Sequence, residues 1–116
     1  MKKYMLAAAV LASLASPSLA FSYKVMSLED FKLDKNSIEV GTRLELAGQL
    51  QQLGELGMLK DGLMDMSPVM VELKGLPREQ RKDLLHCALL CSVIIRGRVD
   101  KVFTGQGLVG EDLTVK

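Results

Sequence analysis

The chain is poor in the side chains that most nucleic-acid and sugar sites use. Its 116 residues include no tryptophan, one histidine, two cysteines and only 4% aromatic residues. Proteins that bind single-stranded nucleic acids or sugars normally present several exposed aromatic rings for stacking. The formal net charge is only +1, whereas proteins that bind polyanions usually carry a clear basic excess. Both shortages argue against nucleic acid as the partner.

The sequence also lacks the motifs of catalysis. It contains no serine elbow, no phosphate-binding loop and no recognisable set of metal ligands,. Glu111 and Asp112 are adjacent acids, but pairs of this kind arise by chance. We therefore predict a protein that is not an enzyme and that needs neither a cofactor nor a metal.

The first twenty residues have the pattern of an export signal. A short basic start, Met1–Lys3, precedes an apolar run over Tyr4–Leu14, and Ser18-Leu19-Ala20 supplies small residues at a cleavage site,. The apolar run is too short to span a bilayer, and no second long apolar run follows,. We expect a bacterial signal peptide over residues 1–20, cleaved after Ala20. The mature chain would then be periplasmic or secreted, with no membrane span.

Strand patterns dominate the rest of the chain. Polar and apolar residues alternate strictly over Arg43–Ala47, which is typical of a half-buried strand,. Pro77 is well placed to begin a helix,, and Ser27 to cap one helical turn that ends near Phe31,. The predicted strands cover residues 39–53, 58–64, 69–73, 91–103 and 108–115, with the main helix at residues 78–86.

The order of three strands, one helix and two strands is that of the OB-fold, a five-stranded Greek-key barrel. Gly48 interrupts the long first strand, at the point where that strand must bend to serve both halves of such a barrel. The stretches Gly41–Gly48 and Cys91–Val99 look like the first and fourth strands of such domains. With Leu76–Cys87, they make the chain similar to small secreted bacterial OB-fold proteins of uncharacterised function. A small SH3-like barrel or an irregular α+β domain is the structural alternative.

This resemblance implies a mostly β, OB-like barrel with one helix between strands three and four. The barrel domain would cover residues 39–116, after an N-terminal extension at residues 21–38. OB domains usually bind on the face of strands one to three, here flanked by loops around residues 54–58 and 104–107. We therefore expect an exported, non-catalytic binding module for an unknown protein or small ligand.

The two cysteines, Cys87 and Cys91, are four residues apart. An exported chain with an even number of cysteines favours a disulfide. For that bridge to form, the helix has to end between the two cysteines. Two free buried thiols or a redox-active pair are the alternatives.

Methionines gather between residues 58 and 70, with Met64 and Met66 as the tightest pair. Thioethers bind Cu(I), so Met64, Met66 and His86 form an alternative metal site, with periplasmic copper or redox handling as its function. Methionine is more often a filler of cores and loops, which is the interpretation that we favour.

Arg43, Arg96, Arg98 and Lys101 form the candidate site for an anion or a partner. Strands one and four are neighbours in an OB barrel, and residues 96 and 98 share one face of a strand. Such a patch would hold a phosphate, sulfate or carboxylate, or serve the second alternative function, single-stranded nucleic-acid binding. The competing interpretation is a solvated face whose arginines are paired with acids such as Glu45 and Asp100,.

Overall fold

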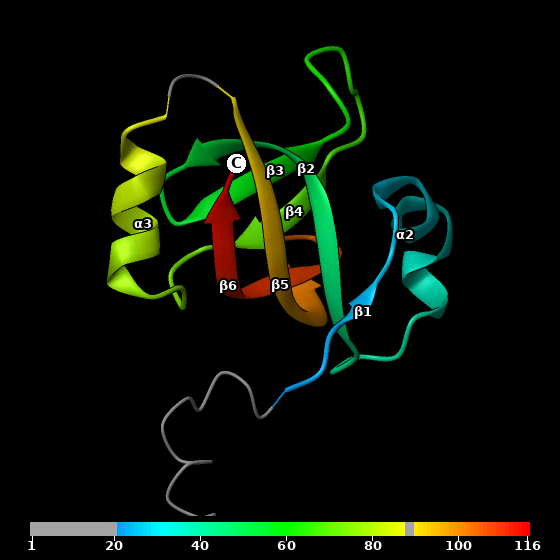
Figure 1. The fold of residues 1–116 in the computed structure, drawn as a ribbon. Helices are drawn as coiled ribbons and strands as arrows, with labels where there is room; N and C mark the ends of the chain where they lie inside the picture. Colours follow the sequence, from blue (N-terminus) through cyan, green and yellow to red (C-terminus); the bar gives the residue numbers. More distant parts are fainter. Residues whose placement is uncertain (1–20, 88–89) are drawn as a thin grey trace, which may run out of the picture.

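The computed structural model describes residues 21–87 and 90–116. The predicted signal peptide, residues 1–20, lies outside the described residues. The described chain is mostly β, with two short α-helices on opposite sides of a barrel (Figure 1). In order, its elements are β1 (Lys24–Val25), α2 (Leu28–Asp34), the 3-10 helix η2 (Lys35–Ser37), β2 (Arg43–Leu53), β3 (Leu56–Lys60), β4 (Val69–Glu72), α3 (Arg78–Leu85), β5 (Cys91–Val102) and β6 (Gly105–Val115).

Strands β2 to β6 form a closed barrel. Strand β2 pairs antiparallel with β3 and β5, β3 with β4, and β5 with β6. A short parallel pairing of β4 with β6 completes the circle. The two-residue strand β1 adds to β2 in parallel.

Gly48 lies where β2 changes partners. Residues 43–50 of β2 pair with β5, and residues 49–53 pair with β3. A Cβ atom on Gly48 would lie 2.9 Å from the carbonyl oxygen of Lys60, which is too close for any other residue without a backbone shift. The expected bend in the first long strand is therefore present at the expected residue.

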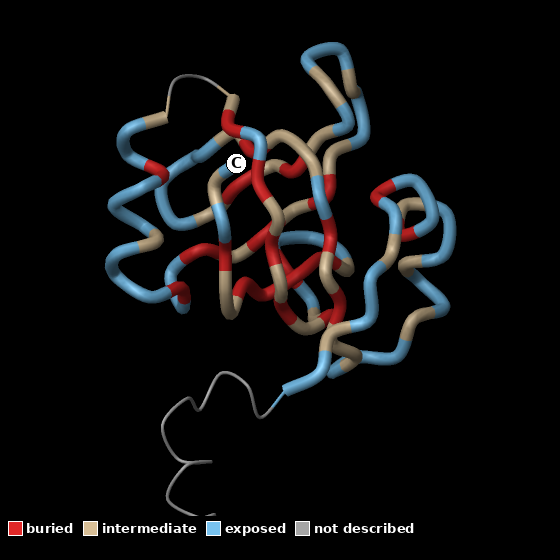
Figure 2. Tube along the Cα trace, viewed as in Figure 1, coloured by how far each residue is buried: buried red, intermediate tan, exposed pale blue. Residues whose placement is uncertain are grey.

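The hydrophobic core fills the barrel because alternate residues of each strand point inward. Leu44, Leu46, Leu59, Val71 and Ile95 have no exposed surface. Figure 2 shows the buried positions along the barrel strands and the exposed ones on the loops and on the outer faces of the helices.

Helix α3 follows β4 and precedes β5, which places it between the third and fourth strands of the barrel. If β1 is counted, these are the fourth and fifth strands of the chain. Its Leu84 belongs to the core, and Gln80 binds to β6. The helix thus covers the side of the barrel where β4 and β6 share only a short pairing.

The segment that precedes the barrel is part of the same packed unit. The Ser27 hydroxyl caps α2 by accepting a hydrogen bond from the Asp30 N–H, and Leu28 and Phe31 belong to the core. Helix α2 continues to Asp34, so the expected single turn near Phe31 was too short. The reason is that α2 buries an apolar side against the barrel.

Three strand boundaries differ from those expected by about three residues or more. The first strand begins at Arg43 instead of residue 39, and the second ends at Lys60 instead of Met64. After Lys60 the chain enters a loop in which the Asp65 carboxylate accepts hydrogen bonds from the Asp61 and Ser67 N–H groups, so Asp61 donates within the loop and not to a strand. The last strand begins at Gly105, after a two-residue turn at 103–104 in which Phe103 adopts a positive φ of 60°.

Within the described part of the chain, no helix has the length and apolar character needed to cross a membrane.

Candidate functional site

The barrel brings the three predicted arginines together. In the β2–β5 register, Arg43 lies opposite Arg98, and Glu45 lies opposite Arg96. Lys101 is exposed near the end of β5 and has the opposite parity to Arg96 and Arg98. The structure therefore gathers three of the four residues of the proposed patch, with Lys101 apart from them.

Carboxylates of the chain itself occupy the space between these arginines. Glu111 accepts two hydrogen bonds from Arg43, each 3.0 Å long, and one of 3.2 Å from Arg98. Arg96 donates to Glu45 at 2.9 Å and to Asp112 at 2.7 Å. Three guanidinium groups thus face three carboxylates, so the positive charge that would attract an external anion is balanced locally.

The pKa shifts agree with this pairing. Burial on its own would raise the pKa of Glu111, but hydrogen bonds from Arg43 and Tyr23 outweigh it, and the pKa is lowered. The hydrogen bond to Glu111 raises the pKa of Arg43, and the bond to Glu45 does the same for Arg96. Both shifts stabilise the charged forms, as in a structural ion-pair network.

The first described residues cover this ion-pair network. The Tyr23 hydroxyl donates to Glu111 at 2.9 Å, and the Arg43 guanidinium lies over the Phe21 ring, 3.7 Å from its centre, in a cation–π contact. Sequence reasoning missed Glu111 and Asp112 because their role depends on the β5–β6 register, which places Asp112 opposite Arg96.

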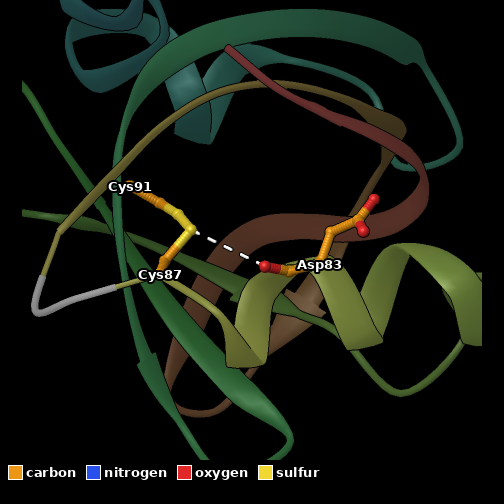
Figure 3. The surroundings of a disulfide bond; sticks show 3 residues. All are labelled: Asp83, Cys87 and Cys91. Carbon is orange, nitrogen blue, oxygen red and sulfur yellow. Dashed lines mark hydrogen bonds between the residues drawn. A yellow bond between two sulfur atoms is a disulfide. The ribbon is translucent and has the colours of Figure 1, made fainter.

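Cys87 and Cys91 are brought together as a disulfide pair, with their Cα atoms 5.7 Å apart (Figure 3). Helix α3 ends at Leu85, before Cys87, as the bridge requires. Cys87 follows the C-terminus of the helix, and its sulfur lies 3.7 Å from the Asp83 carbonyl oxygen. This end of a helix carries negative dipole potential and disfavours a thiolate, so the geometry fits a structural bridge better than a reactive thiol.

The fold does not bring the residues of the alternative metal site together. Met64 and Met66 lie in the β3–β4 loop, while His86 follows α3, on the other side of the barrel from α2 (Figure 1). The loop is tied to the α2 side by bonds from Lys32 to Asp61, at 3.2 Å, and to Asp65. The two thioethers and the imidazole are therefore not neighbours.

The clustered methionines were expected to pack in the core or in loops, and the structure places two of them in a loop and none in the core. Met64 and Met66 are 82% and 90% exposed, and Met58 and Met70 are half-buried on the outer side of the barrel. Gly57, Leu59, Val69 and Val71 take the inward positions of β3 and β4. The parity of these strands therefore places both of their methionines outside.

A second outer surface lies on β2, β3 and β4, and we call it the hairpin face. The register lines its outward side chains up in three rows across the strands. The rows are Gln49–Lys60, Gln51–Met58–Met70 and Leu53–Leu56–Glu72. Among the residues that the structure describes, none of these side chains takes part in a side-chain hydrogen bond or ion pair. The hairpin face is therefore a mixed amide and apolar surface with one cation and one anion at its ends.

The β3–β4 loop extends the hairpin face with a fixed projection. The Asp65 carboxylate accepts hydrogen bonds from the Asp61 and Ser67 N–H groups, both at 2.9 Å, and from Lys32. These bonds lower the pKa of Asp65 to about 2, the bond from Lys32 being the largest cause. They hold a loop on which Leu63, Met64 and Met66 are all at least 70% exposed.

A groove of about 400 Å³ opens beside the other end of the hairpin face. It lies between the end of α3 and the β2–β3 turn, and Gln51, Leu85 and Cys87 are among the residues that line it. A smaller hollow of about 210 Å³ shares Leu85 and reaches Lys74 and Arg81. The larger volume is within the range of small-ligand sites.

No protein-family model matches the chain, and no curated protein is significantly similar to it. Solved structures do resemble it. The hypothetical protein ygiW from E. coli has a TM-score of 0.55 at 16% identity, covering 83% of this chain and 99% of that one. Asparaginyl-tRNA synthetase from Pyrococcus horikoshii has a TM-score of 0.51 at 18% identity, and 78% of this chain covers only 22% of the synthetase. OBody NL8 bound to hen egg-white lysozyme has a TM-score of 0.47 at 22% identity, covering 65% of this chain and 93% of that one.

At these identities the similarity shows the fold alone: a small, mostly β barrel with OB-like neighbours. One neighbour is a tRNA synthetase, so the comparisons give no support to the expectation that argues against nucleic acid as a partner. Fold does not identify a ligand, because OB barrels carry many unrelated functions.

Proposed function

We propose that the chain is an exported, non-catalytic binding module that engages its partner through the hairpin face and the β3–β4 loop. The partner is a protein or a small ligand. Export rests on the signal-like pattern of residues 1–20 and on a disulfide pair, which is typical of oxidising compartments,.

One observation carries this proposal: the two outer faces of β2 differ. Towards β5 and β6, two side chains of β2 are held in the ion-pair network, Arg43 by Glu111 and Glu45 by Arg96. Towards β3 and β4, no side-chain hydrogen bond of the described residues involves Gln49, Gln51 or Lys60. Polar groups without intramolecular partners can bind a ligand without first breaking internal bonds.

The composition of the hairpin face suits a protein partner. Met58 and Met70 pair across the strands at its centre, and thioethers adapt their shape to varied apolar groups. The loop adds three exposed apolar side chains on a backbone that is already fixed by Asp65, which reduces the entropy cost of binding.

The test is site-specific photocrosslinking in the cells that make the protein. A photoreactive phenylalanine analogue at Met58 should give a defined adduct, whereas the same analogue at Lys101 should not. The adduct is identified by mass spectrometry, and the partner is then purified and titrated against the chain. Met58→Asp should weaken that binding about tenfold or more, with Lys101→Gln as the matched surface control. Equal adducts at both positions, or unchanged affinity of Met58→Asp, would refute the assignment.

Export is tested separately by the intact mass of the protein from fractionated bacterial cells. We expect a periplasmic or extracellular chain that begins at Phe21, is two hydrogen atoms lighter than the dithiol and resists alkylation. A cytosolic chain that retains residues 1–20 would contradict export but would leave the binding face unaffected.

Nucleic acid is the second candidate, favoured by the OB-like barrel shared with a tRNA synthetase. Labelled single-stranded RNA and DNA are titrated at low salt by fluorescence anisotropy. Because Arg96 and Arg98 are held in ion pairs, we expect no salt-sensitive binding. Binding that Arg96→Ala and Arg98→Ala both weaken would move nucleic acid ahead of a protein partner.

A further inference from the structure

The described methionines occupy three distinct environments. Met64 and Met66 are 82% and 90% exposed in the β3–β4 loop. Met58 and Met70 are half-buried and pair across β3 and β4. Met26 packs against the hydrophobic core, and its N–H donates to the Glu45 carbonyl oxygen at 3.1 Å.

We propose that Met64 and Met66 are a reversible oxidation site. Their oxidation changes the β3–β4 loop, which extends the hairpin face, from apolar to polar. The co-reactant is a peroxide. A lone pair of the thioether sulfur attacks the terminal peroxide oxygen, an S–O bond forms and the O–O bond breaks. The departing oxygen takes a proton and leaves as water or an alcohol. The sulfur loses two electrons, and the peroxide gains them.

The loop geometry makes this site selective. The Asp65 carboxylate, whose side chain is only 7% exposed, accepts the Asp61 and Ser67 N–H groups and binds Lys32. These bonds fix the loop backbone in a conformation that leaves both thioethers in solvent. Oxidation susceptibility follows exposure, so the loop methionines should react before the others.

The same geometry makes oxidation harmless to the fold. The buried core cluster of the described residues is made of leucine, valine, isoleucine, phenylalanine and cysteine, with Met26 only at its margin. A sulfoxide at Met64 or Met66 therefore disrupts no core packing. It does replace an apolar side chain by a polar one, on a tip where Leu63 would be the remaining exposed apolar residue.

The chemistry is reversible because methionine sulfoxide reductases of the two epimer specificities together restore the thioether. The functional consequence rests on the proposed function of the hairpin face, whereas the selectivity of oxidation does not. The two can therefore fail independently.

The experiment treats the purified chain, begun at Phe21, with limiting hydrogen peroxide. Peptide mapping by mass spectrometry follows each methionine over time. We expect two oxygen atoms to add at Met64 and Met66 at least about fivefold faster than at Met58 or Met70, and faster still than at Met26. Comparable rates at Met58 and Met64 would overturn the proposed site.

Hydrophobic-interaction chromatography then measures the switch without any knowledge of the partner. Oxidation should shorten the retention time of the wild type, and the two reductases should restore it. Met64→Leu with Met66→Leu should keep long retention after peroxide, while the matched control, Met58→Leu with Met70→Leu, should still shift. Unchanged retention after complete loop oxidation would refute the switch. Lost crosslinking at Met58 with retained oxidation selectivity would instead refute only the proposed function.

Discussion

The side-chain oxygen of Gln80 in α3 accepts the backbone N–H of Leu113 in β6 at 2.7 Å. The amide nitrogen of the same Gln80 side chain donates to Asp112 at 2.8 Å. Strand β6 pairs with β5 along its length but with β4 only at residues 108 and 109. Gln80 thus supplies one of the bonds that the missing strand partner would have made, which ties α3 to the barrel.

Replacing Gln80 by leucine should destabilise the protein by about 1–3 kcal/mol, because the part-buried Leu113 N–H loses its acceptor. Urea unfolding measures the loss. The matched control is Glu79→Gln, since the Glu79 side chain is 83% exposed and reaches Lys82 only at 4.0 Å; its effect should stay within about 0.5 kcal/mol. A Gln80→Leu protein as stable as the control would show that water satisfies Leu113.

Glu111→Gln should cost about 1–2 kcal/mol at neutral pH, because Arg43 and Arg98 lose their shared negative partner, whose side chain is only 17% exposed,. The lowered pKa of Glu111 sets the sign of the pH dependence. The stabilisation is present above the ordinary value of 4.5 and is lost as the pH falls through the folded-state pKa,. The gap between wild type and variant, measured by urea unfolding, should therefore narrow below pH 4.5. Glu55→Gln is the exposed control, and a gap that widens in acid would contradict the ion-pair account.

Reduction of the Cys87–Cys91 pair should lower the free energy of unfolding by about 2 kcal/mol or less, because the closed loop is short,. Urea titrations with and without a reductant measure it, and the double variant Cys87→Ser with Cys91→Ser should match the reduced protein. A reductant effect on that double variant would mean that the loss has another cause.

The barrel was predictable because its signals are local. Each signal lies within one stretch of chain: the alternation over Arg43–Ala47, the bend at Gly48 and the start of α3 after Pro77. The spacing of the two cysteines required the helix to end before the bridge could form, and α3 does end before Cys87. These local signals were enough to predict a mostly β barrel, and the solved structures that resemble the chain are OB-like.

The surfaces were not predictable to the same degree, because they depend on pairings between distant strands. Arg43 meets Glu111 across 68 residues, and nothing in the sequence near either residue indicates the other. The outward position of Met58 depends on the parity of a five-residue strand, and a shift of one residue would have buried it. Composition could therefore suggest basic and methionine clusters, but only the register shows that the arginines are paired with carboxylates and that Met58 and Met70 point outward.

Asp65→Asn should release the β3–β4 loop. An amide can keep one of the backbone bonds to Asp61 and Ser67, but it loses the charge that binds Lys32, and we expect a cost of about 1–2 kcal/mol. Amide hydrogen exchange at Asp61 and Ser67 should accelerate, which reports the loop directly. Asp61→Asn is the control in the same loop, since its side chain is 59% exposed and binds only Lys32.

The lowered pKa of Asp65 determines how amide exchange in the β3–β4 loop changes with pH. The folded-state pKa of Asp65 is about 2, below the ordinary value of 3.8, so its contribution is complete above pH 3.8 and is lost as the pH falls towards 2,. Exchange at Ser67, corrected for intrinsic rates, should therefore be slow in the wild type at pH 4 and approach that of Asp65→Asn near pH 2. A wild-type loop that opens at pH 4 or above would mean that Asp65 does not hold the exposed methionines in place.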